Sequence, residues 1–415
     1  MRITKSGCKL SINIAIAGAG IGGLCCALAM AKSGFTVTVF EQSSVIQEVG
    51  AGLQLSPNAV TVLNALQLSP LLTPYVFCPQ KAVMRHYQHA TEYFSVPLAG
   101  RCEQRFGAPY WHIHRADLQA SLYQACIACG VDVRLAKQVV AYEQNAAQST
   151  VKCILADGSH WQCDVLIGAD GIHSKVQASM LQQTGLTSHP RFTGQVAWRG
   201  TVPVNKLAPG LVEPNATLWV GPGKHFVNYY LRAGKEVNFV AVEERSDWQH
   251  ESWRQAGDIS TLRGLFGDWH PQVQELLAAA DSCFVWALHD RAPLSNWVHG
   301  NVALLGDACH PMLPFLAQGA AMAIEDGYVL AQMLSQHKNK AQALKHYQNA
   351  RLQRTSQVQS DARRNAAFYH MSSPIQRAKL KMLSAMSGSG INNWLAAKKL
   401  DTLYGYNAVE RTKVI

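Results

Sequence analysis

The first hydrophobic pattern in the chain predicts a β-α-β unit. Residues 12–17 are an apolar run of strand length, and residues 24–34 read as a helix that ends at Gly34. Residues 36–40 are β-branched and aromatic, which favours a second strand. The apolar stretch 12–31 also looks like a signal peptide, but Asn13 and several glycines interrupt it. The β-α-β unit therefore accounts for this stretch better.

The turn of this unit carries the first chemical signal. The sequence GAGIGG at 18–23 places Gly18, Gly20 and Gly23 in a G-x-G-x-x-G pattern. The first glycine permits the tight turn, the second lets a pyrophosphate approach, and the third lets helix and strand pack closely. Glu41 follows Gly23 by 18 residues, at the end of the second strand, where a carboxylate can accept the ribose hydroxyls. Together these features predict a dinucleotide site; the alternative for Glu41 is a solvated charge.

Two further segments favour contact with a ligand. The loop that follows residue 49 contains Gly50 and Gly52, which permit a planar ligand to approach the backbone closely. Ser56 or Asn58 is expected to cap the helix after it. Another helix begins at Arg115, a residue that either reaches a phosphate or lies at the surface.

Short strands follow, and one of them ends in a carboxylate. Strands are expected at residues 131–135, 137–142, 151–155, 161–163 and 164–167, with a hairpin turn at 156–159. Asp170 comes directly after the last of them. Because open α/β sheets bind ligands at the carboxyl ends of their strands, Asp170 is a further candidate.

The pattern changes between residues 187 and 290, where alternating strands dominate. They are expected at 194–202, 217–220, 225–232, 237–242 and 282–289, and helices only at 260–267 and 271–280. This predicts an antiparallel sheet with one face in use, inserted into the nucleotide-binding domain. Covering a ligand is the natural task of such an insertion.

Residues 301–327 combine three features that suit a cofactor. A strand at 302–305 is followed by Gly306 and Asp307, Pro311 and Pro314 fix an extended loop, and a helix begins at about Gln318. A carboxylate, a rigid loop and free helix N–H groups suit a cofactor with hydroxyls and a delocalised negative charge. Beyond residue 330 the chain is expected to be helical and basic, with breaks at Pro374 and at 387–390.

Composition narrows the class of protein. A chain of 415 residues with 48% hydrophobic and 15% charged residues predicts two domains and a helical tail rather than disorder. The net charge of +10 and the pI of about 9.1 raise the question of nucleic acid, but no aromatic-interleaved nucleic-acid module is present. A basic field also attracts anionic substrates or NADPH. No other apolar run approaches the roughly 18 residues of a membrane span.

The cysteines predict reduced thiols. There are eleven of them, scattered along the chain, which is typical of a cytoplasmic protein and not of a disulfide framework. Cys126 and Cys129 form a C-x-x-C, but they lie in a helical pattern without a second pair at zinc-ligand spacing, so no metal is expected. Only one dinucleotide fingerprint is present, so a second dinucleotide must visit without such a site of its own.

Three motifs now stand in order: GAGIGG with Glu41, GADGIHSKV at 168–176, and GDACHPMLPFLAQGAAMAIEDG at 306–327. Over residues 12–370 the chain resembles the FAD-dependent aromatic hydroxylases, the single-component flavoprotein monooxygenases typified by para-hydroxybenzoate hydroxylase. Within them it is similar to the salicylate hydroxylase, 6-hydroxynicotinate monooxygenase and 3-hydroxybenzoate 6-hydroxylase group. The resemblance implies an α/β fold: a Rossmann-like FAD-binding domain, an inserted antiparallel substrate sheet and a helical C-terminal tail.

The resemblance also implies roles for individual residues. The three motif glycines would cradle the pyrophosphate of FAD, and Glu41 would hold the adenosine ribose. Asp170 would serve FAD and NAD(P)H, and Asp307 would contact the ribityl chain. The remaining implied FAD contacts are Gly52, Leu53, Arg115 and Val139, with Gln318, Gly319 and Ala320 at the flavin N1–C2=O edge.

The implied reaction hydroxylates a phenol with O2 and transient NADPH or NADH, through a flavin C4a-hydroperoxide. In this group a histidine in an H-x-x-x-Y setting lies over the flavin, and His225 and Tyr229 match it. At i and i+4 on a strand both face one side, and histidine suits a general base. His310 is the alternative base. Pro314 is expected to form one wall of the reaction site. The 3-hydroxybenzoate-type members have a polar side chain at this place in the loop, so Pro314 fits the salicylate-type loop better.

The expected organisation follows the motifs. Residues 1–76, 105–180 and 292–370 would form the FAD-binding domain, residues 77–104 and 181–291 the substrate sheet, and residues 371–415 a helical segment. The expected partners are a small aromatic substrate and O2, with no nucleic acid, in a cytoplasmic monomer or homodimer. Two alternatives remain: a polyprenyl-phenol hydroxylase of ubiquinone synthesis whose basic tail makes a peripheral membrane contact, and a non-catalytic basic binding protein on an FAD fold.

Overall fold

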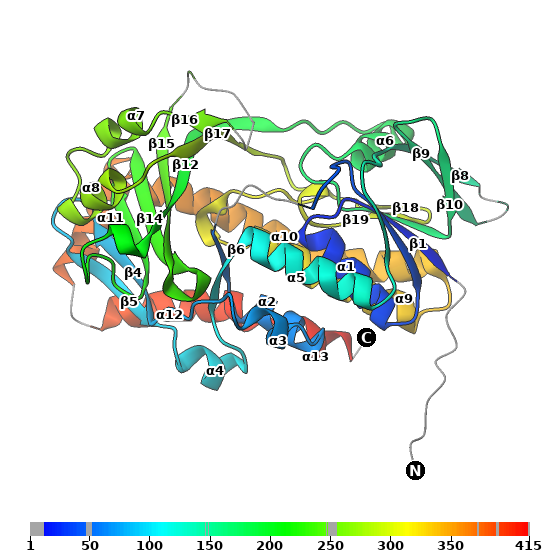
Figure 1. Cartoon of the computed structure of the whole chain (residues 1–415), viewed down its shortest axis with the longest axis horizontal. Coiled ribbons are helices and arrows are strands. Elements are labelled where there is room, and N and C mark those ends of the chain that lie inside the picture. The colour runs from blue at the N-terminus through cyan, green and yellow to red at the C-terminus, as the bar shows by residue number, and fades with distance from the viewer. Residues whose placement is uncertain are drawn as a thin grey trace, which may run out of the picture.

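Two large sheets lie toward opposite ends of the molecule, and long helices run between them (Figure 1). The computed structural model describes residues 12–46, 52–145, 147, 149–245, 247, 255–371, 373–386 and 390–413. Gly50 and residues 387–389, which entered the sequence predictions, lie outside the described residues. Within the described part, no helix combines the length and the apolar character that crossing a bilayer requires.

The nucleotide-binding sheet has six strands, parallel except for the edge strand β18. Their order is β18 (Val298–His299), β19 (Val302–Leu304), β11 (Val165–Gly168), β1 (Asn13–Ala17), β2 (Thr36–Phe40) and β7 (Asp132–Arg134). Strand β11 is buried throughout, as expected for a parallel strand covered on both faces. Helix α1 (Ile21–Lys32) packs on β1 and β2, and α5 (Arg115–Ala128) and α9 (Gly319–Gln336) pack against α1.

The register of this sheet brings the three sequence motifs together. Ala17 pairs with Gly168, and Gly168 pairs with Leu304, so the carboxyl ends of β1, β11 and β19 lie side by side. The loops that leave these ends are the glycine turn, the Asp170 loop and the Asp307 loop. All three loops therefore lie at the carboxyl ends of the parallel strands, as the rule for open α/β sheets predicts.

Two smaller sheets complete this part of the chain. Strands β8 (Val139–Asn145), β9 (Thr150–Leu155) and β10 (His160–Cys163) are antiparallel, which confirms the predicted hairpin. Strand β3 (Gly52–Leu55) pairs with β6 (Trp111–His114). The short helices here are α2 (Pro57–Ala65), α3 (Ser69–Leu72), α4 (Arg101–Phe106) and α6 (Lys175–Thr184).

The second large sheet has eight strands. Their order is β16 (Ala256–Gly257), β17 (Cys283–Asp290), β12 (Arg191–Pro203), β15 (Glu236–Glu244), β14 (Lys224–Leu231), β13 (Ala216–Gly221), β4 (Lys81–His86) and β5 (Glu92–Pro97). The prediction of an antiparallel sheet needs one correction, because β13 and β4 are parallel. Strand β4 comes from a distant segment, so no hairpin constrains its direction.

The two faces of this sheet have different neighbours. Helices α7 (Ile259–Leu265) and α8 (Pro271–Ala278) cover one face, where Phe226, Phe239 and Leu276 belong to one apolar core. His225 and Tyr229 alternate with Phe226 along β14, so they lie on the other face, where Tyr229 contacts Gly52 and His225 contacts Phe315. The predicted shared face of these two residues is therefore confirmed.

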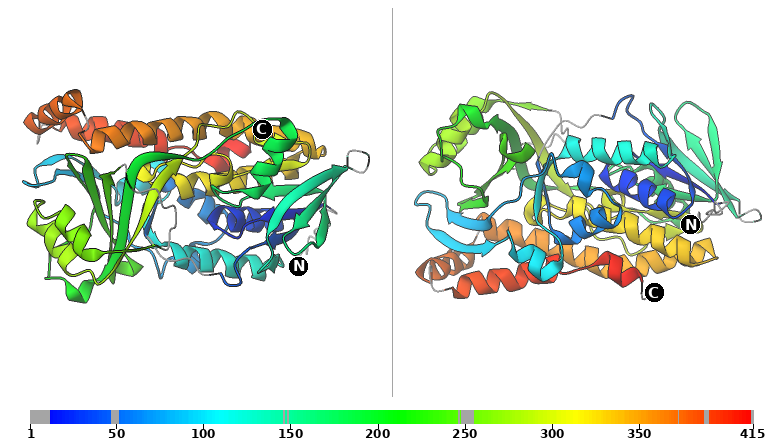
Figure 2. Two further views of the ribbon diagram at one scale, coloured as in Figure 1. Left: turned by 90° about the horizontal axis from the view of Figure 1, so that it is seen from above. Right: turned by 60° about the horizontal axis from the view of Figure 1, so that its bottom comes forward.

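The last part of the chain is helical, but with more breaks than predicted. Its helices are α10 (Lys340–Tyr369), α11 (Pro374–Ala385), α12 (Ile391–Tyr404) and α13 (Ala408–Thr412). The expected break at Pro374 is present, but another separates α9 from α10, where Asn339 Oδ1 accepts from the Gln342 N–H at 3.0 Å. Helix α10 runs lengthwise along the molecule toward the eight-stranded sheet (Figures 1 and 2).

Candidate active site

The glycine turn leaves the first turn of α1 open to a ligand. Gly18 has φ +102°, and a Cβ there would lie 2.4 Å from the Ala169 oxygen. A Cβ on Gly23 would lie 2.0 Å from the Gly18 oxygen, whereas one on Gly20 would meet nothing within 4 Å. Gly20 is the N-cap of α1, so its open side faces a helix N-terminus, where a pyrophosphate is stabilised.

Glu41 is fixed beside this turn. Its Oε2 accepts from the Ala19 N–H at 2.8 Å, and its Oε1 accepts from the Ser43 N–H at 2.9 Å. A carboxylate has about four lone-pair positions, so these two bonds leave others for hydroxyl donors. The partly buried position argues against a merely solvated charge.

Strand β3 contacts the eight-stranded sheet through Gly52. The Gly52 N–H donates to Asn238 Oδ1 at 2.8 Å, and a Cβ on Gly52 would lie 2.6 Å from the Tyr229 ring. Leu53 pairs with Ile113 of β6. Val139 is buried at the start of β8, where its contacts are those of an ordinary core residue. The close approach at Gly52 thus serves Tyr229 itself.

Arg115 and Asp307 influence each other across the edge of the nucleotide-binding sheet. Arg115 opens α5 and is partly buried. Burial lowers the pKa of Arg115, and the charge of Asp307 opposes that effect. Asp307 is exposed in part, but the protein around its carboxylate desolvates it and raises the pKa of Asp307. The charges of His310 and Arg115 oppose this increase. The two side chains therefore lie close enough for their charges to interact.

Asp170 is engaged by the start of α6. Its Oδ1 accepts from Ser174 Oγ at 2.5 Å, and its Oδ2 accepts from the N–H groups of Lys175 at 2.8 Å and Val176 at 3.2 Å. The carboxylate therefore stabilises a helix N-terminus at the same edge of the sheet, whatever contact a ligand adds.

Polar side chains at the start of α2 bind Gln318, the N-cap residue of α9. Gln318 Nε2 donates to Ser56 Oγ at 2.8 Å, and Asn58 Nδ2 donates to Gln318 Oε1 at 3.2 Å. Ser56 is the N-cap residue of α2, as predicted, but its side chain makes no capping bond because it serves this network. Gly319 and Ala320 begin the helix and are partly exposed, so their N–H groups can face an anion.

His310 is buried, and its ring faces Asp326 of α9. Its Nε2 lies 2.5 Å from Asp326 Oδ2, and Arg351 Nε donates to Asp326 Oδ1 at 2.7 Å. Cys309 is adjacent, and one ligand atom of each of Cys309, His310 and Asp326 lies within 4.8 Å of the others. Since Asp326 already binds Arg351 and the Gly306 N–H, the group forms an ion-pair network and not a metal site. This contact with Asp326 favours His225 over His310 as the base.

His225 is enclosed by aromatic rings. It is 2% exposed, and its ring centroid lies 5.1 Å from that of Phe315 in the proline loop. Pro314 opens the short 3-10 helix Pro314–Leu316 and is exposed. Burial lowers the pKa of His225 well below its ordinary value, and the neighbouring His370 adds to the effect. These surroundings favour the neutral imidazole, which has one ring nitrogen that can accept a hydrogen bond.

The sequence predictions missed Arg199, a buried cation on β12. It is 2% exposed and lies over the Trp286 ring at 5.0 Å. Register places it on the same face as Tyr229, because Arg199 pairs with Val240 and Tyr229 pairs with Asn238 two residues away. Burial lowers the pKa of Arg199 to about 10; Arg115 contributes to this and Tyr229 opposes it. A charged residue within an otherwise apolar strand was the signal available in the sequence.

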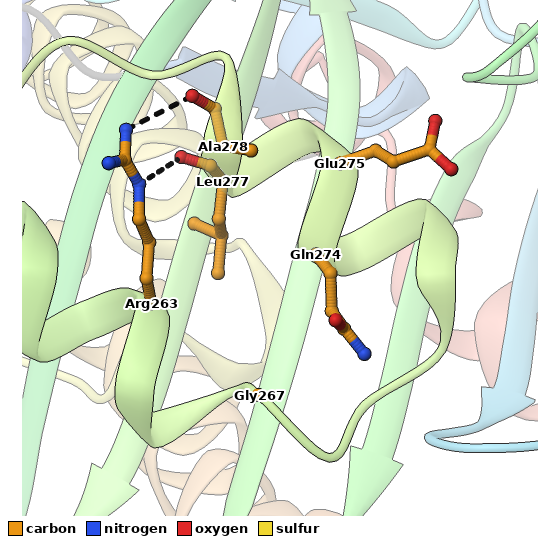
Figure 3. A pocket seen from close by; sticks show the side chains of 6 residues that line it. All are labelled: Arg263, Gly267, Gln274, Glu275, Leu277 and Ala278. Atoms are coloured by element: carbon orange, nitrogen blue, oxygen red, sulfur yellow. Dashed lines mark hydrogen bonds between the residues drawn. The ribbon is translucent and has the colours of Figure 1, made fainter.

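A pocket of about 350 Å³ lies elsewhere, against α7 and α8 (Figure 3). Its lining includes Arg263, whose guanidinium donates to the carbonyls of Leu277, Ala278 and Ala280 and so terminates α8. These helices cover the opposite face of the sheet from His225. The pocket is separate from the candidate active site.

The fold and the site define a class of protein. A glycine turn, a carboxylate at the neighbouring strand end and an open helix N-terminus lie at the carboxyl ends of the parallel strands, and the eight-stranded sheet contributes a buried histidine. The family model described as "FAD binding domain" matches residues 11–362 of the chain. The chain belongs to this family, and it is an FAD-dependent aromatic hydroxylase.

Individual relatives agree with this class. The chain is 36% identical to the 3-hydroxybenzoate 6-hydroxylase 1 of Aquipseudomonas alcaligenes, over 97% of this chain and 99% of that protein. It is 32% identical to the 6-hydroxynicotinate 3-monooxygenase of Bordetella bronchiseptica, over 84% of this chain and 89% of that one. A salicylate hydroxylase solved as a substrate complex aligns with a TM-score of 0.81 and 27% identity, over 97% of both chains. The fold and the FAD cofactor predicted from the sequence are thereby confirmed.

Proposed function

We propose that the protein uses NADH or NADPH and O2 to hydroxylate a small aromatic acid that carries a ring hydroxyl. The observation that supports this best is the placement of His225. A buried, neutral histidine on the inner face of the sheet lies against Phe315, between the prolines and the start of α9. The names of the relatives describe hydroxybenzoates and hydroxynicotinate, which are substrates of this chemical class.

The residues at the sheet edge fit FAD. We assign the pyrophosphate to the open side of Gly20, the adenosine ribose to Glu41, and the middle of the cofactor to Arg115 and Asp307. The N–H groups at the start of α9 would face the flavin N1–C2=O edge, where a helix N-terminus stabilises negative charge. When bound, FAD supplies the electron transfer from NAD(P)H to O2 and the oxygen transfer to the ring.

The side chains of the chain itself would prepare the substrate. Nδ1 of His225 faces His370, so Nε2 is the nitrogen we assign to the substrate hydroxyl. Removal of that proton makes the ring electron-rich. Arg199 would bind the substrate carboxylate, because a buried cation near Arg115 is stabilised by an anion. Tyr229 lies beside Arg199, and Pro314 would help to keep water from the reacting atoms.

Replacement of His225 by Asn tests the proposal. We expect product formation per unit time to fall by about 10²-fold, the usual contribution of a general base, with FAD content unchanged. The measurement is hydroxylated product by mass spectrometry, alongside NAD(P)H oxidation, with 3-hydroxybenzoate, salicylate and 6-hydroxynicotinate. His270→Asn is the matched control, because His270 caps α8 on the remote face and Asn also caps well. An unchanged rate in His225→Asn would remove His225 as the base.

A further inference from the structure

The base assigned above needs a route by which its proton leaves. His225 is 2% exposed, and burial disfavours its charged form. An imidazolium there would be costly to retain through a catalytic cycle. Tyr369, whose ring lies beside that of His225, is also titratable. Its hydroxyl donates a hydrogen bond to the Phe315 carbonyl at 3.0 Å, and burial raises the pKa of Tyr369, which keeps the hydroxyl protonated. Tyr369 is therefore a poor acceptor for this proton.

A chain of hydrogen-bonding groups leads from His225 to the surface. His225 Nδ1 lies 2.7 Å from His370 Nε2, and His370 Nδ1 lies 3.1 Å from Glu244 Oε1. The exposed fraction changes from 0% for the His370 side chain to 43% for that of Glu244. A buried ring nitrogen is thus connected to solvent through two contacts of hydrogen-bond length.

The tautomers of this chain are mutually consistent. With Glu244 ionised, His370 carries its proton on Nδ1 and donates to the carboxylate, so His370 Nε2 is an acceptor. His225 then carries its proton on Nδ1 and donates to His370, which leaves His225 Nε2 as an acceptor for a phenol. Gln195 Nε2 lies 3.4 Å from His370 Nδ1, but the carboxylate is nearer and charged, so it is the better partner.

Backbone bonds fix the geometry of this chain. His370 ends α10, and its carbonyl accepts from the Gly223 N–H at 2.8 Å. The Gly223 carbonyl in turn accepts from the Glu244 N–H at 2.9 Å. Gly223 therefore ties the end of α10, where His370 lies, to the end of β15, where Glu244 lies.

We propose that His370 and Glu244 form a proton relay that carries the substrate proton from His225 to solvent. The substrate O–H bond breaks as a proton joins His225 Nε2, and the proton of His225 Nδ1 passes to His370 Nε2. The proton of His370 Nδ1 then passes to Glu244, which releases it to water. One proton leaves the substrate and one enters solvent, and both histidines end neutral. His370 and Glu244 are relay residues, and the proposal rests on the function proposed above.

The test follows proton release directly. The holoenzyme is mixed with 3-hydroxybenzoate in a weakly buffered solution near pH 7.5 with a pH-indicator dye, and the ultraviolet absorbance of the phenolate is recorded in parallel. At this pH the free phenol is protonated, since phenols ionise near pH 10. We expect one proton released per bound substrate, and we expect Glu244→Gln and His370→Gln to slow that release at least tenfold while FAD content stays normal.

Controls separate the relay from the proposed function and from folding. Asp281→Asn removes a carboxylate with a 77% exposed side chain on the same sheet domain and should leave the release rate unchanged. In His370→Ala, added imidazole should restore part of the rate. If His225→Asn slows proton release but His370→Gln and Glu244→Gln do not, the relay is wrong and the base stands. If the wild type binds none of 3-hydroxybenzoate, salicylate and 6-hydroxynicotinate and releases no proton with any of them, the proposed function fails and the relay with it.

Discussion

Arg199 is the single side chain from which we infer a requirement on the substrate. It lies on the inner face of the eight-stranded sheet, and both its burial and the charge of Arg115 lower its pKa. Two cations held near each other in a poorly solvated region repel, and an anionic group between them offsets that repulsion. The carboxylate of a hydroxybenzoate provides such a group, whereas a neutral phenol does not.

The replacement Arg199→Met should therefore weaken binding of acids selectively. A charge-assisted hydrogen bond contributes about 1.5–3 kcal/mol, so we expect KM for 3-hydroxybenzoate to rise roughly 10- to 100-fold. The KM for the matched 3-hydroxybenzamide should change much less. The measurement is substrate-stimulated NAD(P)H oxidation across both compounds. An equal change in KM for the acid and the amide would show that Arg199 does not bind the carboxylate.

Single residues also mark the limit of what the sequence predicts. The glycine turn and Glu41 are local, because their spacing within one β-α-β unit determines their geometry, and the structure places them together at one turn. Arg199 carried only the signal of a charge in an apolar strand. His370 carried none, since its contact with His225 joins residues 145 positions apart. Side chains that meet through tertiary packing cannot be paired from one sequence.

At the scale of elements, α9 and α10 are joined by buried charges. Asp326 and Glu325 of α9 and Arg351 of α10 all have fully buried side chains, with Arg351 Nη1 2.6 Å from Glu325 Oε2. Burial raises the pKa of Asp326, but His310 and Arg351 overcome this and lower it to about 2. The same α9 begins with the N–H groups assigned to the flavin, so this pairing holds the flavin-facing end of the helix in place.

The replacement Arg351→Met should destabilise the protein strongly, because it leaves buried carboxylates without their cation. Breaking a buried ion pair from one side costs about 3–5 kcal/mol, and we expect a loss of that size in urea unfolding of the holoenzyme. Arg364→Met in the same helix is the control, since the Arg364 side chain is 68% exposed and its loss should matter little. Adding Asp326→Asn to Arg351→Met should recover part of the loss. A loss below about 1 kcal/mol for Arg351→Met would contradict this view.

Helices and strands were predicted well where a segment had one clear pattern of apolar and polar residues. Strands β1, β2 and β17 appear close to their predicted residues, because continuous apolar runs and strict alternation are local patterns. The parallel direction of β4 and the break at Asn339 were missed. The direction of β4 depends on its pairing with β13, which is distant in sequence. The break depends on Asn339 as the N-cap of α10, and polar residues on both sides of Asn339 hide this cap in the sequence.

At the scale of the whole molecule, the site exists only because two sheets face each other. Most of the residues that we assign to FAD lie beside the carboxyl ends of the six-stranded sheet, and His225 and Arg199 lie on the eight-stranded one. Helix α10 connects the two, since Arg351 binds α9 near its middle and His370 reaches His225 at its end. The domain boundaries and the individual cofactor contacts stay predictions, as does the peripheral membrane contact of the basic tail, although Ile375 and Trp394 there are exposed.

Buried histidines at the junction of the sheets should make the folded state sensitive to acid. Burial lowers the pKa of His112 to about 3, an effect that the Tyr230 backbone opposes, and the pKa of His225 is also lowered. In the unfolded chain these side chains accept protons near pH 6.5. The unfolded state therefore binds more protons below that pH, so the stability contributed by neutral burial is complete above pH 6.5 and declines as the pH falls toward 3.

The slope of this decline can be measured and assigned. Each buried histidine should reduce the free energy of unfolding by about 1.4 kcal/mol per pH unit between roughly pH 6 and pH 4. Urea unfolding at pH 7.5, 6.0 and 5.0 would give the slope for the wild type and for His112→Phe, which keeps a ring against Phe77 and Tyr229 but cannot take a proton. We expect the variant to have a slope smaller by about one proton. A replacement of the exposed His160 should leave the slope unchanged, and an identical slope in His112→Phe would mean that His112 is already protonated in the folded protein.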